Sequence, residues 1–115
     1  MPYLAPPSAA AATGGRTVVT YTASPAFDGT LNGSAFEMTL TGAVAPSITN
    51  ITDNFTYTIW FIQDATGGRV VTWPGTWKWL NGTPMVLSTT ASAVDSVTVL
   101  VRGTTIYAVP GKAFA

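Results

Sequence analysis

Hydrophobic and polar residues alternate with a period of two along most of the chain. In "AFEMTLTG" (35–42), the side chains of Phe36, Met38 and Leu40 fall on one face, opposite glutamate and threonine. Successive side chains of a β-strand point to opposite faces, so this spacing is typical of a half-buried strand. The segment "RTVVTYTA" (16–23) alternates in a similar way, and the pattern predicts a second strand there.

The longest extended pattern is "FTYTIWFIQ" (55–63), which begins with alternation and then becomes continuously apolar at Trp60, Phe61 and Ile62. A strand that is buried on both faces has such a run, so we expect this one in the interior of the sheet. The glycines of "ATGG" predict a turn after it, and "RVVTW" (69–73) is then expected to return as its hairpin partner.

The C-terminal third predicts more strands. "PMVLSTT" (84–90) starts at a proline, which favours an edge strand. "DSVTVLVRGTTIYAVPG" (95–111) reads as a hairpin with Gly103 at its turn. No stretch of ten or more residues carries a helical apolar stripe. We therefore expect one all-β domain over residues 16–115, an antiparallel β-sandwich or jelly-roll-like fold.

Residues 1–15 are expected to form an extended N-terminal arm ahead of this domain. The segment is rich in proline and alanine, and proline fixes φ in the range of polyproline geometry. It has too little apolar bulk for a core of its own. We expect it to lie as a strap on a neighbouring subunit, through the candidate contact residues Tyr3, Leu4, Pro6 and Pro7.

Charge is scarce and balanced, with five basic and five acidic residues among 115. This composition argues against nucleic acid or an anionic membrane as a partner, and no apolar run is long enough to span a bilayer. The N-terminus also lacks the features of a signal peptide. Twenty threonines supply the polar surface instead of charges. A surface so poor in charge favours a protein surrounded by other protein, and we expect self-association as a homotrimer.

Candidate chemistry is sparse. Histidine and cysteine are absent, which excludes the common nucleophile–base pairs and thiolate metal sites. The five carboxylates are scattered over separate predicted elements: Asp28, Glu37, Asp53, Asp64 and Asp95. Their spacing gives no facing pair of the kind that glycosidases use. We therefore expect no enzymatic activity, no catalytic residues, no cofactor and no metal. Asp64 and Arg69 flank the predicted turn, where they are expected to pair and to fix its register.

Three tryptophans, Trp73, Trp77 and Trp79, fall within seven residues. Aromatic residues at alternate positions of a strand usually form a core face or a subunit contact. The alternative is an exposed platform on which a glycan could stack. The core or interface interpretation is favoured, because few polar groups accompany the rings.

From about Asn54 onward, three segments carry a family resemblance: "YTIWFIQDATGGRVVTWP", "WKWLNGTP" and "STTASAVDSVTVLVRGTTIYA". With them, the chain resembles a small β module of tailed-bacteriophage structural proteins, notably the C-terminal parts of tail fibres and related virion appendages. The resemblance implies a trimer-forming or host-surface-binding module in the virion and brings no catalytic residues with it.

The resemblance leaves two main functions open. A tail fibre carries an attachment region and a shaft ahead of its tip, and 115 residues leave no room for them. We therefore expect a capsid decoration, or cement, protein on the outer surface of the virion, bound to the major capsid protein and to copies of itself. The alternative is a tail-fibre or appendage tip that binds host-surface glycan through the Trp73–Trp79 region. A depolymerase fragment that uses the scattered acids is a third reading.

Overall fold

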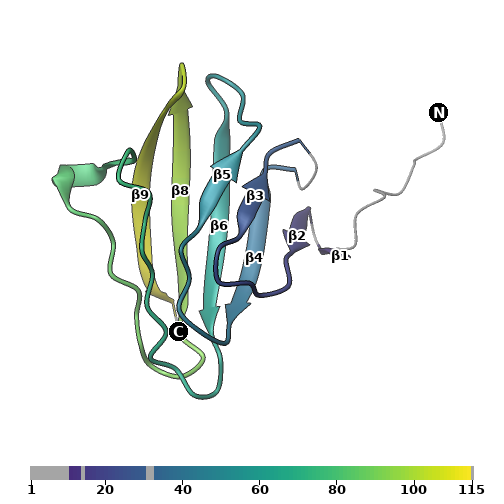
Figure 1. Ribbon diagram of the computed structural model, residues 1–115, viewed down its shortest axis with the longest axis vertical. Helices are drawn as coiled ribbons and strands as arrows, with labels where there is room; N and C mark the ends of the chain where they lie inside the picture. Colours follow the sequence, from purple (N-terminus) through teal and green to yellow (C-terminus); the bar gives the residue numbers. More distant parts are fainter. Residues whose placement is uncertain (1–10, 14, 31–32, 115) are drawn as a thin grey trace.

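The computed structural model describes residues 11–114 except 14 and 31–32 (Figure 1). It contains a seven-stranded sheet in the order β1-β2-β4-β6-β8-β9-β7 and a two-stranded sheet of β3 and β5. The strands of the large sheet are β1 (Ala11–Thr13), β2 (Arg16–Val18), β4 (Ala35–Leu40), β6 (Thr56–Gln63), β7 (Lys78–Trp79), β8 (Val94–Arg102) and β9 (Thr105–Phe114). The small sheet consists of β3 (Ala26–Asp28) and β5 (Ser47–Thr49).

The all-β class predicted from the sequence is confirmed, but the sheet is mixed. Strand β4 runs parallel to both β2 and β6, and β7 runs parallel to β9. The central pairs β6–β8 and β8–β9 are antiparallel, as is β1–β2. The long connection between β4 and β6, which contains β5, returns the chain to the starting end of the sheet, so these two strands run in the same direction. The strand order does not confirm a jelly roll.

One face of the large sheet carries the core. Figure 1 shows β3 and β5 in a layer in front of β4 and β6. Phe27 of β3 joins the layers, since its ring centroid lies 5.2 Å from that of Phe36 and 6.1 Å from that of Phe61. The side chains that are less than 2 % exposed fill the space between the layers: Tyr57, Phe27, Phe36, Phe61, Met38, Leu40, Ile59, Val97 and Val99.

The opposite face of the large sheet, called the outer face below, has no second layer over it among the described residues. Trp60 and Ile62 lie on this face and are half-buried, whereas Phe61 between them is 2 % exposed. The expected burial of this strand on both faces is therefore wrong. Alternation continues to the end of β6, and the apolar residues at 60 and 62 mark an outer face that is itself partly apolar.

Several predicted strands are shorter than expected or absent. Residues 69–73 do not pair with β6, whose two sides are occupied by β4 and β8, and only Val71 makes an isolated bridge, to Val44. Residues 84–90 form no strand, and 16–23 are extended in the sheet only at Arg16–Val18. The strand at 35–40 is confirmed. So is the C-terminal hairpin, where Gly103 turns the chain with φ of +65°.

The proposed contact residues of the arm, Tyr3, Leu4, Pro6 and Pro7, lie outside the described residues. Residues 11–13, which the sequence analysis assigned to the arm, form strand β1 and pair with β2. A 3₁₀ turn at Leu80–Gly82 is the helical element of the described chain. No helix within these residues has the length and apolar character needed to cross a membrane.

Candidate functional site

The loop that follows β6 is closed by a buried glutamine. The Gln63 side chain is 3 % exposed. Its Nε2 donates to the carbonyl oxygens of Arg69 and Ser88, each at 2.9 Å, and its Oε1 accepts from the Arg69 amide at 3.0 Å. One amide side chain thus replaces the backbone pairing that a hairpin would have supplied. It ties residues 64–69 to a second loop near residue 88.

Asp64 and Arg69 reinforce the same loop, as the sequence predicted. Arg69 Nη2 donates to Asp64 Oδ2 at 2.9 Å, and the amides of Thr66 and Gly67 donate to Asp64 Oδ1. The hydrogen bond from the Arg69 guanidinium is the main cause that lowers the pKa of Asp64 from its ordinary value. The reciprocal bond raises the pKa of Arg69. The pair stabilises the turn.

The second loop, residues 88–95, is anchored by a buried carboxylate. Asp95 is 2 % exposed and accepts hydrogen bonds from the amide and the hydroxyl of Ser88. The amide of Ser92 donates to the Asp64 carbonyl oxygen, and the amide of Gly68 donates to the Thr89 carbonyl oxygen. The segments "QDATGGR" and "STTASAVD", which carry the family resemblance, therefore hold each other in place. Their role is structural.

The remaining carboxylates also serve the fold. Asp28 accepts from the Thr30 amide and the Asn50 side chain, Asp53 accepts from the Gly103 amide, and Glu37 pairs with Arg16. No group of three or more metal-ligating side chains occurs in the described part of the chain. The described carboxylates thus form hydrogen bonds and ion pairs that stabilise loops and the sheet edge.

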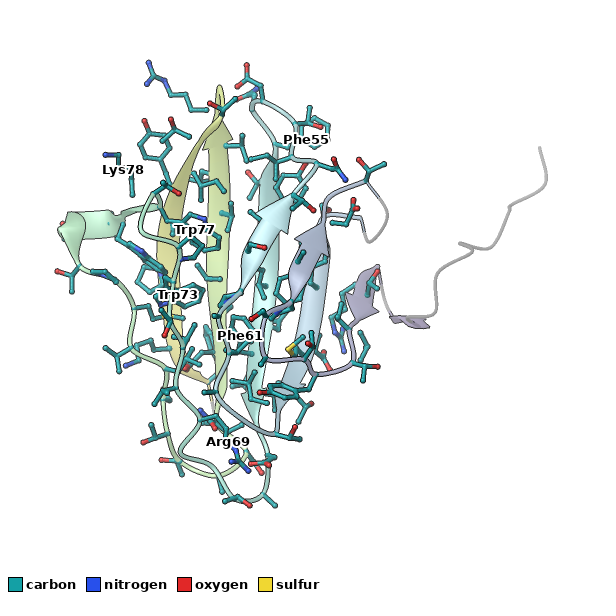
Figure 2. All side chains as sticks on the ribbon, viewed as in Figure 1. Phe55, Phe61, Arg69, Trp73, Trp77 and Lys78 are labelled. Atoms are coloured by element: carbon teal, nitrogen blue, oxygen red, sulfur yellow. The ribbon has the colours of Figure 1, made fainter. Side chains whose placement is uncertain are left out.

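The three tryptophans form one cluster on the core side of β9. Figure 2 shows two of them, Trp73 and Trp77, close to each other. Their ring centroids lie between 4.9 and 6.1 Å apart, and the Trp73 ring lies 5.9 Å from that of Phe61. Trp77 is only 7 % exposed, while Trp73 and Trp79 are half-buried. Trp73 Nε1 donates to the carbonyl oxygen of Met85 at 2.7 Å. The cluster therefore closes the core beneath the loop, and Trp73 and Trp79 remain partly exposed.

A shallow hollow of about 370 Å³ lies beside the tryptophan cluster. Its walls come from Trp73, Trp77 and Trp79 and from the loop residues on both sides of them, including Met85 and Val86. No charged residue lines it, and the Trp73 indole N–H is already bonded to protein. This inner hollow is mainly apolar and offers a saccharide few polar partners.

The outer face carries a different arrangement at its β7–β9 end. Strand register places Thr56, Leu100, Tyr107 and Lys78 in one row across β6, β8, β9 and β7. Residues paired in register share a face of the sheet, and the neighbours of Tyr107 in sequence, Ile106 and Ala108, are buried in the core. The four side chains of the row therefore lie together on the outer face.

Two open hollows meet along this row. One, of about 520 Å³, is lined by residues that include Asn54, Phe55 and Arg102. The other, of about 320 Å³, is lined by residues that include Lys78, Trp79, Leu80 and Asn81. Leu100 and Tyr107 line both hollows, so the two adjoin at these side chains, and together they are called the Tyr107 trough below.

The Tyr107 trough has an apolar floor and polar ends. Leu100, which is 41 % exposed, forms the floor together with Tyr107. The amides of Asn54 and Asn81 stand at opposite ends, each residue held with positive φ by its turn. Lys78 and Arg102 are the charged residues of the lining. A concave apolar surface with a few polar groups is the usual form of a small-ligand site.

The candidate binding residues predicted from the sequence are Trp73, Trp77 and Trp79, and the structure brings these three together. Leu100, Arg102 and Tyr107 were not among the predicted residues. The alternation of "VTVLVRGTTIYAV" (97–109) could have placed two of them on the outer face, because Leu100 and Tyr107 fall opposite the buried valines. The position of Lys78 beside Tyr107 had no such signal, because β7 joins β9 across a long stretch of chain.

The fold and these contacts define a structural β module in which the described carboxylates stabilise loops. Residues 25–106 match a family model described as "Putative phage tail fibre C-terminal domain". The match spans more than half of the chain, which therefore belongs to this family of phage tail fibre C-terminal domains. No curated protein and no solved structure gives a significant match.

Membership confirms the phage structural module that the sequence resemblance indicated, and it makes the chain a virion component. It fits the tail-fibre interpretation of the sequence better than the capsid decoration interpretation, which it does not support. The family is a structural one.

Proposed function

We propose that this chain is a receptor-binding tip domain of a phage tail fibre, exposed at the surface of the particle, and that it binds host-surface glycan without cleaving it. Membership in the tail fibre family supports the location. The observation that carries the binding function is the Tyr107 trough, the open and partly apolar depression on the outer face of the sheet, with Leu100 and Tyr107 at its centre. The engagement of the described carboxylates in the fold supports binding without hydrolysis.

The domain works as one of three identical copies in this proposal. Only 9 % of the residues are charged, and apolar side chains outside the trough are solvent-exposed, including Val70, Val86 and Phe114. A surface this poor in charge favours contact with further protein. Three copies on one fibre also raise the effective affinity of a shallow site, because each later contact is made at high local concentration.

Two measurements test this function. Antibodies against the domain, labelled with gold, are expected to decorate the distal ends of tail fibres in micrographs of intact phage. Label on the head would overturn the proposal in favour of capsid decoration. The purified domain is expected to compete with phage adsorption to host cells and to bind isolated host polysaccharide without shortening it. Release of oligosaccharides would instead show that the domain is an enzyme.

A further inference from the structure

We propose that the Tyr107 trough, rather than the hollow beside the tryptophan cluster, is the saccharide site, and that its ligand is an anionic saccharide bearing carboxylate or phosphate groups. This inference rests on the proposed glycan-binding function and names the site and ligand class for it. The observation behind it is the pairing of an aromatic and apolar floor with two cations that have no acidic partner in the described chain.

The row of side chains gives the trough its length. Thr56, Leu100, Tyr107 and Lys78 stand on four adjacent strands. Neighbouring strands lie about 4.8 Å apart, so the row extends for about 14 Å. Asn54 borders the trough at one end, and Leu80 with Asn81 borders it at the other end. An extended ligand of more than one sugar ring can therefore lie across the strands.

The floor suits the apolar faces of sugar rings. Leu100 and the half-buried ring of Tyr107 present carbon surface at the centre of the trough. Aromatic rings carry partial negative charge on their faces and attract the C–H groups of a saccharide ring. Hydroxyl and amide groups of Thr56, Asn54 and Asn81 can pair with sugar hydroxyls at the margins.

The charges select the ligand. The ion pairs of the described residues are Arg16–Glu37 and Arg69–Asp64, so within this part of the chain Lys78 and Arg102 have no acidic partner. No aspartate or glutamate lines either hollow of the trough. The nearby Asp53 accepts a hydrogen bond from the Gly103 amide beyond the lining. The guanidinium of Arg102 can bind a carboxylate or a phosphate oxygen pair in a bidentate manner, and Lys78 adds a second positive point charge.

The inner hollow lacks these features. It holds no charged residue, its tryptophan N–H is bonded to Met85, and its aromatic rings pack mainly on one another. Two cations are also too few for nucleic acid, whose affinity depends on neutralising many phosphates. A short anionic saccharide matches both the number of charges and the apolar floor.

The test measures binding of the full chain by titration calorimetry at low salt. One probe is a short oligogalacturonide, compared with its methyl ester, in which the carboxylates are neutral. The other is a phosphorylated lipopolysaccharide core oligosaccharide, compared before and after enzymatic dephosphorylation. We expect at least one charged form to bind and its neutral counterpart to bind at least about fivefold more weakly, as for the loss of an exposed charge contact. The probe whose charged form binds shows whether carboxylate or phosphate is the recognised group.

Variants locate the site. Lys78→Gln and Arg102→Gln are each expected to weaken binding about fivefold. Lys112→Gln removes an exposed cation outside the trough lining and is expected to leave binding unchanged. Leu100→Glu places a negative charge on the floor and is expected to abolish binding. Val86→Glu places a negative charge in the inner hollow, where Val86 is 71 % exposed, and is expected to leave saccharide binding unchanged.

Each outcome decides the inference. Loss of binding with Val86→Glu but not with Leu100→Glu would assign the site to the tryptophan hollow and overturn this proposal, while glycan binding itself stands. Equal binding of charged and neutral probes would overturn the anionic ligand class. Binding of no saccharide at all would overturn both this inference and the proposed function. Far-ultraviolet circular dichroism of each variant verifies that these exposed substitutions leave the fold intact.

Discussion

Gln63 shows how one side chain can define a loop. It is buried and satisfies three backbone groups of the two loops at one end of the sheet. A polar group in the core is stable only when its hydrogen bonds are formed. The Gln63 side chain therefore stabilises the conformation of both loops, although the residue itself lies at the end of strand β6.

Replacement of Gln63 by leucine is expected to destabilise the domain by about 3 kcal/mol. The change leaves the amide and carbonyl of Arg69 and the carbonyl of Ser88 without their partner, and each buried unpaired group is unfavourable by about 1–3 kcal/mol. Urea denaturation of the full chain measures the effect. Thr66→Ala, at an exposed position of the same loop, is the control and is expected to stay within about 0.5 kcal/mol of the wild type.

The Asp64–Arg69 pair gives a prediction about pH. The pKa of Asp64 is lowered in the folded state, so the pair stabilises the fold above the ordinary carboxyl pKa of 3.8. That stabilisation is lost as the pH falls through the lower, folded-state value. Wild type is expected to be more stable than Arg69→Gln at neutral pH, and the difference is expected to shrink steadily in acid below pH 3.8.

Denaturation midpoints measured across this pH range test the expectation. Arg102→Gln serves as the matched control, because Arg102 is exposed and forms no ion pair within the described residues. Its difference from the wild type is expected to stay constant over the same pH range. A gap for Arg69→Gln that is just as flat would contradict the role assigned to the pair.

At the scale of elements, the turn after β6 depends on two adjacent glycines for different reasons. Both Gly67 and Gly68 have positive φ, of +72° and +76°. A Cβ atom on Gly67 would lie 2.5 Å from the Thr89 carbonyl oxygen and 2.9 Å from the Ala91 amide nitrogen, whereas a Cβ atom on Gly68 would meet nothing within 4 Å. Only Gly67 is needed for the close approach of the two loops.

This contrast predicts unequal effects of the same substitution. Gly68→Ala introduces only the strain of an L-residue in the left-handed region and is expected to destabilise the fold by about 1 kcal/mol. Gly67→Ala adds a collision with backbone atoms and is expected to destabilise it by about 3 kcal/mol. Thermal or urea unfolding of the two variants measures the difference. Equal effects would mean that the loops are not in the contact described.

The elements also show which parts of the fold were readable from the sequence. The strand at 35–40 and the hairpin predicted over 95–111 were readable, because their alternation matches burial on one face. The segment 69–73 has an equally good strand pattern. It does not pair with β6, because β4 and β8 occupy both sides of that strand, and the hydrogen bonds of Gln63 hold the loop in a different conformation. Pairing partners are a property of the assembled sheet, which local pattern does not encode.

The candidate site, too, was predictable from the sequence only in part. The tryptophan cluster was visible in the sequence, as was its favoured core role, and Trp77 is indeed buried. The Tyr107 trough was not foreseen. Its row joins residues from β6, β7, β8 and β9, and the parallel pairing of Lys78 with Tyr107 depends on how a long loop returns to the sheet edge.

At the scale of the whole molecule, the described surface combines few charges with scattered apolar side chains. Leu80 and Val70 are each more than half exposed, in addition to the residues of the trough. Light scattering coupled to size exclusion is expected to give a mass of three chains. A mass of one chain at all accessible concentrations would contradict the proposed trimer. The affinity of the domain for glycan would then be that of a single site.

The order of strands has a consequence for biosynthesis. Strand β9 lies between β8 and β7, and β7 joins the sheet only through it, although β7 precedes it in the chain by more than twenty residues. A ribosome must therefore release residues as far as 114 before the sheet can close. Until then the free edge of β8 is an open template for another nascent chain. Fibre subunits made side by side on one polysome are consequently at greatest risk of mispairing just before translation of this domain finishes.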